Sequence, residues 1–100
     1  MKLSEMLRGA ASFLTKDNWS KHIYYEDTRH GKYCAIGAIS KCANIPKGGV
    51  DYMNFVNMEK SVDKLLGQRM CDFNDNDKTS FEDVISKLNE LAVKAEQQGL

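Results

Sequence analysis

Hydrophobic residues recur at helical spacing in several stretches of the chain. Near the start they follow an i, i+3, i+4, i+7 pattern, which predicts a helix with one buried face over about Ser4 to Lys16. The small, apolar stretch that begins at Tyr33 and is closed by Pro46 predicts a second helix, buried on nearly all sides. A rough helical period from Tyr52 to Gly67 predicts a third helix, either continuous or with a kinked first turn near Asn57.

The last stretch has the clearest pattern. Its apolar residues share one stripe and its charged residues the opposite face, which predicts a fourth helix from Phe81 to about Gln98. Thr79 is the expected N-cap, with Glu82 reaching back to complete a capping box. Gly37 lies in the middle of the second helix, where glycine is unfavourable by about 1 kcal/mol relative to alanine. We therefore expect another backbone to pack closely against Gly37.

Residues 19–33 break the helical period. This stretch is rich in aromatic residues and ends in a polar cluster before Gly31, so it is either a short β-hairpin with Gly31 in the turn or an irregular aromatic loop. The predicted fold is mainly α, a compact bundle of about four helices with this segment between the first and second. A chain of 100 residues suits one globular domain spanning 1–100.

Composition narrows the functional classes. The 14 basic and 14 acidic residues give a formal net charge of zero, so we expect no nucleic-acid partner. No apolar run reaches membrane-spanning length, and charges interrupt the apolar residues near the N-terminus, so we expect a soluble protein that is neither exported nor membrane-bound. The three cysteines are an odd number without disulfide-framework spacing, which favours the cytoplasm.

The stretch "CDFNDNDKTSFED", residues 71 to 83, allows two interpretations. Asp72, Asn74, Asn76 and Asp83 match ligand positions of a calcium loop, but Asp77 stands where that loop needs glycine, and Asp83 is shorter than the usual glutamate. The same residues fit a structural loop that turns the chain into the capped final helix. We favour the structural loop and expect no metal or other cofactor.

Cys34 is the main candidate for catalysis. It stands at the start of a helix, where a thiolate is favoured, and His30 precedes it by four residues, so the two could form a nucleophile and base. No nucleophile signature surrounds Cys34, however, and a cysteine in an apolar helix is more often a small buried hydrophobe. Cys34 and Cys42 would lie about 12 Å apart along one helix, too far for a disulfide, so only Cys71 could bridge to either.

Two motifs resemble those of a family of small uncharacterised proteins from bacteriophages and some bacteria. The first is "YCAIGAI", which resembles the family's aromatic-Cys-Ala-x-Gly-Ala helix. The second is "FNDNDKTSFED", which resembles its Trp-Asn-Asp loop and capped last helix, with Phe73 in place of tryptophan. The resemblance covers about two thirds of the chain and implies a helical fold but no activity. It also suggests that Asn74 and Asp75 tie the last helix to the Cys34 helix through buried hydrogen bonds.

The leading functional hypothesis is a non-catalytic protein-binding module, such as a phage accessory protein that inhibits or redirects a host protein. Its motivation is the small size, the zero net charge and a surplus of aromatic residues of the kind that interfaces favour. The candidate contact residues are Trp19, Tyr24, Tyr25, Tyr52 and Phe55. The same aromatics could instead complete a small core. The alternatives are a small enzyme or thiol-dependent protein using Cys34, and a calcium-responsive module using residues 72–83; the oligomeric state stays open.

Overall fold

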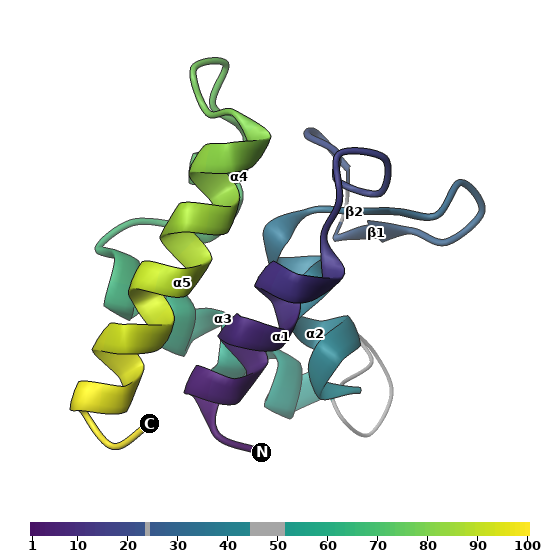
Figure 1. Cartoon of the computed structure of the whole chain (residues 1–100). Helices are drawn as coiled ribbons and strands as arrows, with labels where there is room; N and C mark the ends of the chain where they lie inside the picture. The colour runs from purple at the N-terminus through teal and green to yellow at the C-terminus, as the bar shows by residue number, and fades with distance from the viewer. Residues whose placement is uncertain (24, 45–51) are drawn as a thin grey trace.

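The computed structural model describes residues 1–23, 25–44 and 52–100, without the side chain of Tyr52. Within these ranges the chain is mainly helical, as predicted. Figure 1 shows its helices and the one small sheet, which are α1 (Leu3–Phe13), β1 (Glu26–Asp27), β2 (Lys32–Tyr33), α2 (Ala35–Ala43), α3 (Tyr52–Leu66), α4 (Met70–Asp75) and α5 (Phe81–Gln97).

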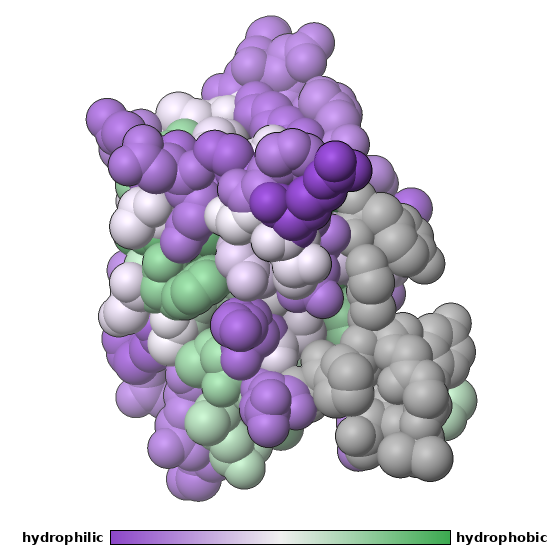
Figure 2. Space-filling view, turned by 90° about the vertical axis from the view of Figure 1, so that its right-hand side faces the viewer, coloured by the Kyte–Doolittle hydropathy of each residue, from purple (hydrophilic) through white to green (hydrophobic). Residues whose placement is uncertain are grey.

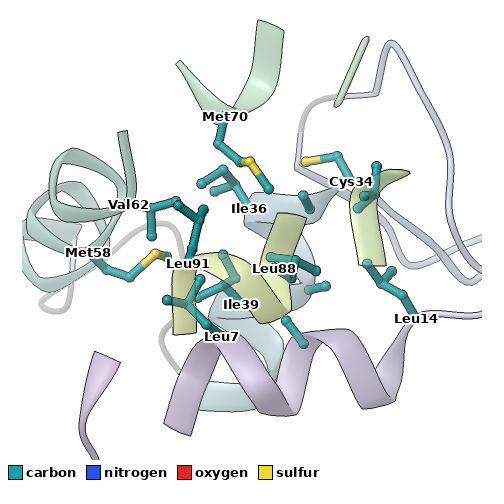
Figure 3. Packing of buried hydrophobic residues seen from close by; sticks show 14 of the residues in the cluster. Leu7, Leu14, Cys34, Ile36, Ile39, Met58, Val62, Met70, Leu88 and Leu91 are labelled. Atoms are coloured by element: carbon teal, nitrogen blue, oxygen red, sulfur yellow. The ribbon is translucent and has the colours of Figure 1, made fainter. Parts of the chain in front are cut away.

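The core lies where α1, α2 and α5 meet, and α3 and α4 close it from another side. The helices α1 and α5 run antiparallel (Figure 1), and ion pairs from Arg8 to Glu96 and from Lys16 to Glu82 lie along their exposed seam. Figure 3 shows aliphatic side chains from these helices converging on Ile39 and Leu88, both fully buried. The buried stripes are those predicted from the helical spacing, because each amphipathic helix turns its one apolar face inward.

The first helix is shorter than predicted, because it ends at Phe13 rather than near Lys16. The side chain of Asn18 explains the early end. Its amide donates to the Phe13 carbonyl at 3.0 Å, and its oxygen accepts from the Thr15 N–H at 2.7 Å. These bonds satisfy backbone groups that a longer helix would have paired internally, so the chain leaves the helix here.

Between α1 and α2 the chain forms a short antiparallel hairpin, one of the two alternatives predicted. Glu26 pairs with Tyr33 and Asp27 with Lys32, and Gly31 takes a positive φ of 64° in the connecting turn. The N–H of Cys34 donates to the Tyr25 carbonyl at 2.9 Å, which holds the base of the hairpin against the start of α2.

Gly37 confirms the predicted close approach of another backbone. A Cβ atom at this position would overlap the carbonyl oxygen of Tyr25. The hairpin can therefore lie directly on α2 only because residue 37 has no side chain.

The stretch 71–83, predicted as a structural loop and the start of the last helix, also contains part of a further helix. Residues Met70–Asp75 form α4, which is the helix that the predicted bundle of about four lacked. Its first N–H, that of Met70, donates to the carboxylate of Asp63 on α3 at 2.8 Å. The cap comes from a residue seven positions earlier, on another helix, so local sequence patterns could not reveal it.

The capping box of the last helix lies one residue later than predicted. Ser80, not Thr79, is the N-cap, and Asp83, not Glu82, completes the box: the Asp83 N–H donates to Ser80 Oγ at 3.1 Å, and the Ser80 N–H donates to Asp83 Oδ2 at 3.0 Å. Thr79 is buried instead. The sequence "TSFED" offers two overlapping boxes, and packing selects the one that buries Thr79.

Candidate functional site

The two motifs meet where α4 packs on the start of α2, and Asn74 is the centre of that junction. Asn74 is fully buried. Its side-chain oxygen accepts from the Ala35 N–H at 3.0 Å and from the indole N–H of Trp19 at 2.7 Å. Its amide donates to the Ser20 carbonyl at 3.1 Å and to Asp75 Oδ1 at 2.9 Å. Asn74 thus makes all four hydrogen bonds that its side chain can make.

Asp75 extends the junction toward the aromatic segment. Its Oδ1 accepts from the backbone N–H of His22 at 2.9 Å, and His22 has a positive φ of 59°. Asn74 therefore ties α4 to the start of the Cys34 helix, whereas Asp75 accepts from the N–H of His22. Both residues belong to α4, where the sequence predicted a loop before the last helix.

Hydrogen bonding is complete in this junction. Among the described residues, no buried side-chain nitrogen or oxygen lacks a partner. A catalytic group needs free capacity to exchange a proton or to bind a substrate, and Asn74 has none. The arrangement fits a structural role, in which polar groups fix how three segments join.

The candidate contact aromatics are largely occupied inside the molecule. Phe55 is 2% exposed and belongs to the core, so it is not a surface residue. Tyr25 packs edge-on against Phe55 with ring centroids 4.9 Å apart, and Trp19 lies 6.0 Å from the ring of Phe81. Tyr24 and the side chain of Tyr52 lie outside the described residues.

The four residues of the proposed calcium loop do not converge as such a loop would require. Asp72 is exposed on α4, Asn74 points into the junction, Asn76 follows the end of α4, and Asp83 is engaged in the capping box. Among the described residues, no group of three or more His, Cys, Asp or Glu side chains is placed to hold a metal ion.

Cys34 and His30 lie in different elements of the structure. Cys34 is the N-cap of α2, is 2% exposed, and its sulfur accepts from the Gly37 N–H at 3.5 Å. His30 lies in the exposed hairpin turn, where its Nδ1 is 2.8 Å from Asp27 Oδ2. The adjacent His30 lowers the pKa of Asp27 through that hydrogen bond. The predicted nucleophile and base therefore serve two different local structures.

The thiol next to Cys34 is that of Cys71, which the helix spacing had left as a possible disulfide partner. The Cys71 thiol beside it lowers the pKa of Cys34 by hydrogen bonding, and backbone N–H groups at the start of α2 act in the same direction, while burial opposes them. The same contact raises the pKa of Cys71. Cys71 is partly exposed, and its sulfur also lies 3.8 Å from Glu59 Oε2.

A separate hollow lies at the end of the molecule that holds both termini. It has a volume of about 620 Å³ and lies between the start of α1, the end of α2, residues 54–61 of α3 and the residues after α5. Its apolar lining is Met1, Leu3, Met6, Ala43, Met58 and Leu100. The rest of the lining is Lys2, Gly99 and three polar residues along α3, namely Asn54, Asn57 and Ser61. The sequence pattern did not reveal the hollow, because its walls come from four segments far apart in the chain.

The face in Figure 2 is mainly hydrophilic in its upper part, and hydrophobic residues reach the surface in small groups lower down. No helix in the described ranges combines the length and apolarity needed to cross a bilayer.

The chain belongs to a family of unknown function, DUF6197, whose model matches residues 1–94. This match confirms that the protein comes from a family without an assigned activity. It covers both motifs, and thus both sides of the junction around Asn74. No match was found among curated proteins or among solved structures.

Proposed function

We propose that this protein is a non-catalytic binding module that holds an apolar segment of a partner protein in the hollow between α1, α3 and the end of α5. The observation that carries the proposal is the hollow itself, with its volume of about 620 Å³. It is large enough for several side chains of a partner, and pockets of this size are typical of binding sites.

The lining supports a protein segment as the occupant. Three methionines, Met1, Met6 and Met58, contribute to it, and methionine side chains adapt their shape to different apolar partners. Met1 and Leu100 are 72% and 42% exposed beside the hollow, where a partner could cover them. The amides of Asn54 and Asn57 offer hydrogen bonds at the rim, as in interfaces with an apolar centre and a polar edge.

The junction around Asn74 supports a non-catalytic role, because its polar groups are used up in holding the fold together. The resemblance to bacteriophage and bacterial proteins supports the further proposal that the partner is a host protein that the module inhibits or redirects.

The test compares two arginine variants of exposed helical asparagines. Asn57→Arg fills the hollow with a long charged side chain, whereas Asn89→Arg makes the same change on the exposed face of α5. A partner is first captured from bacterial lysate with the tagged wild-type protein, and its affinity for purified wild type and variants is then measured by calorimetry. We expect Asn57→Arg to weaken binding by at least about tenfold, which is about 1.4 kcal/mol, and Asn89→Arg to leave the affinity unchanged.

Equal affinities of wild type and Asn57→Arg would show that the partner binds elsewhere. Equal weakening by both arginine variants would point to a general effect of charge rather than to occupancy of the hollow. Circular dichroism of both variants checks that each remains folded.

A further inference from the structure

The structure brings together two thiols that neither the fold nor the proposed binding function requires as a pair. Cys34 caps α2 and Cys71 lies in the first turn of α4, 37 positions later in the chain. Each thiol lies close enough to the other to shift its pKa. Figure 3 shows the sulfur of Cys34 pointing toward the side chain of Met70, the residue just before Cys71.

The contact between the two helices is fixed by the junction. Asn74, one turn after Cys71, accepts from the N–H of Ala35, the residue after Cys34, at 3.0 Å. Residues 71 and 74 share a face of α4, because positions three apart on a helix are neighbours. The buried bond of Asn74 therefore holds Cys71 against the start of α2.

We propose that Cys34 and Cys71 form a reversible intramolecular disulfide, which makes the contact between α2 and α4 a site of oxidation by a small peroxide. The environment of Cys34 favours reaction at its sulfur. It lies at a helix N-terminus and accepts from the Gly37 N–H at 3.5 Å, so the backbone stabilises negative charge on the sulfur.

The chemistry takes two steps. The Cys34 sulfur attacks one oxygen of hydrogen peroxide and the O–O bond breaks; the departing hydroxide leaves as water with the Cys34 proton, and Cys34 becomes a sulfenic acid. The Cys71 sulfur then attacks the Cys34 sulfur, so that the S–S bond forms and the S–O bond breaks. The hydroxide released takes the Cys71 proton and leaves as a second water. The two cysteines lose two electrons in total, and the peroxide gains them.

The third cysteine provides an internal control. Cys42 lies in α2 and packs over Gly9 of α1, where a Cβ atom at residue 9 would overlap its sulfur. It thus faces α1, whereas the start of α2 faces α4. The structure predicts that oxidation links Cys34 to Cys71 and leaves Cys42 as a thiol.

Peptide mapping tests this connectivity directly. Trypsin separates the three cysteines, because it releases peptides 33–41, 42–47 and 70–78, each with one of them. The reduced, folded protein is treated with hydrogen peroxide, free thiols are alkylated, and the digest is analysed by mass spectrometry. We expect peptide 33–41 linked to peptide 70–78, a loss of two hydrogen atoms from the intact monomer, and recovery of both thiols with dithiothreitol.

Variants and denaturant sharpen the result. Cys42→Ser should form the same link. Cys71→Ser should instead accumulate the sulfenic acid of Cys34, which dimedone traps. The link should form at least about tenfold faster in the folded protein than in concentrated urea, because the fold holds the two sulfurs together. A link that includes Cys42, a link between two molecules, an absence of any link, or equal rates in the folded and unfolded chains would each overturn the proposal.

Discussion

Removing the side chain of Asn74 should destabilise the protein more than any other single loss of a hydrogen-bonding group that we describe. Asn74→Ala deletes four hydrogen bonds, three of which join α4 to α2 and to the segment at Trp19, while the fourth goes to the neighbouring Asp75. The heaviest loss falls on the N–H of Ala35, which is fully buried and would have no partner.

The magnitude follows from what each partner loses. An unsatisfied buried N–H costs about 1–3 kcal/mol, and the partly exposed indole N–H of Trp19 adds about 0.5–1.5 kcal/mol because water replaces its bond only in part. The acceptors at Ser20 and Asp75 are partly exposed and regain water, so we expect a total of roughly 2–4 kcal/mol. For a domain of this size the melting temperature should fall by roughly 8–30 °C, at about 4–8 °C per kcal/mol.

Urea unfolding measures this loss as a lower midpoint at an unchanged slope. Trp19, the only tryptophan, serves as the fluorescence probe, and circular dichroism provides a second signal that does not depend on the junction. Asn89→Ala is the matched control, since it makes the same change on an exposed face of α5. An Asn74→Ala midpoint equal to that of the wild type, or a loss no larger than that of Asn89→Ala, would refute the role assigned to the junction.

Four further variants test other parts of the structure. Gly37→Ala should lower the free energy of unfolding by at least about 2 kcal/mol, because its Cβ meets a backbone carbonyl that has little room to move; a variant as stable as the wild type in urea would contradict the close packing. Ser80→Ala should lower the free energy of unfolding by about 1 kcal/mol, because the N-cap hydrogen bond is lost. In Thr79→Ala the Ser80 hydroxyl should still accept from the Asp83 N–H, and an unchanged NMR shift of the Asp83 amide would confirm the register of the capping box. His30→Ala should raise the pKa of Asp27 toward its ordinary value, because His30 lowers that pKa in the wild type. The stabilisation from this pair is present above the unfolded-state pKa of the carboxyl and is lost as the pH falls through its folded-state pKa. An Asp27 titration by NMR that is the same in the variant and the wild type would disprove the contact.

The helices themselves follow from the sequence. The apolar stripes of α1 and α5, the apolar composition of α2 and the turn signal at Gly31 were readable in advance, because each depends on residues a few positions apart. The errors are the missed helix α4, which was predicted as a loop, and the positions of two element ends. The end of α1 was missed because Asn18 bonds back to Phe13, and the cap of α5 was misplaced by one residue because two overlapping boxes are locally equivalent.

The contacts between distant segments were decided by tertiary structure. The resemblance to a family pointed to Asn74 as a tie to the Cys34 helix, but not to its bond with Trp19, 55 positions away. Spacing left Cys71 as the one possible partner of Cys34, yet only the packing of α4 on α2 places the two thiols together. The hollow likewise needs α1, α3 and the end of α5 at once. Local sequence specifies which backbone groups a helix leaves unpaired at its ends. The side chain that pairs with those groups can come from a distant element, and burial of the apolar stripes decides which element lies alongside.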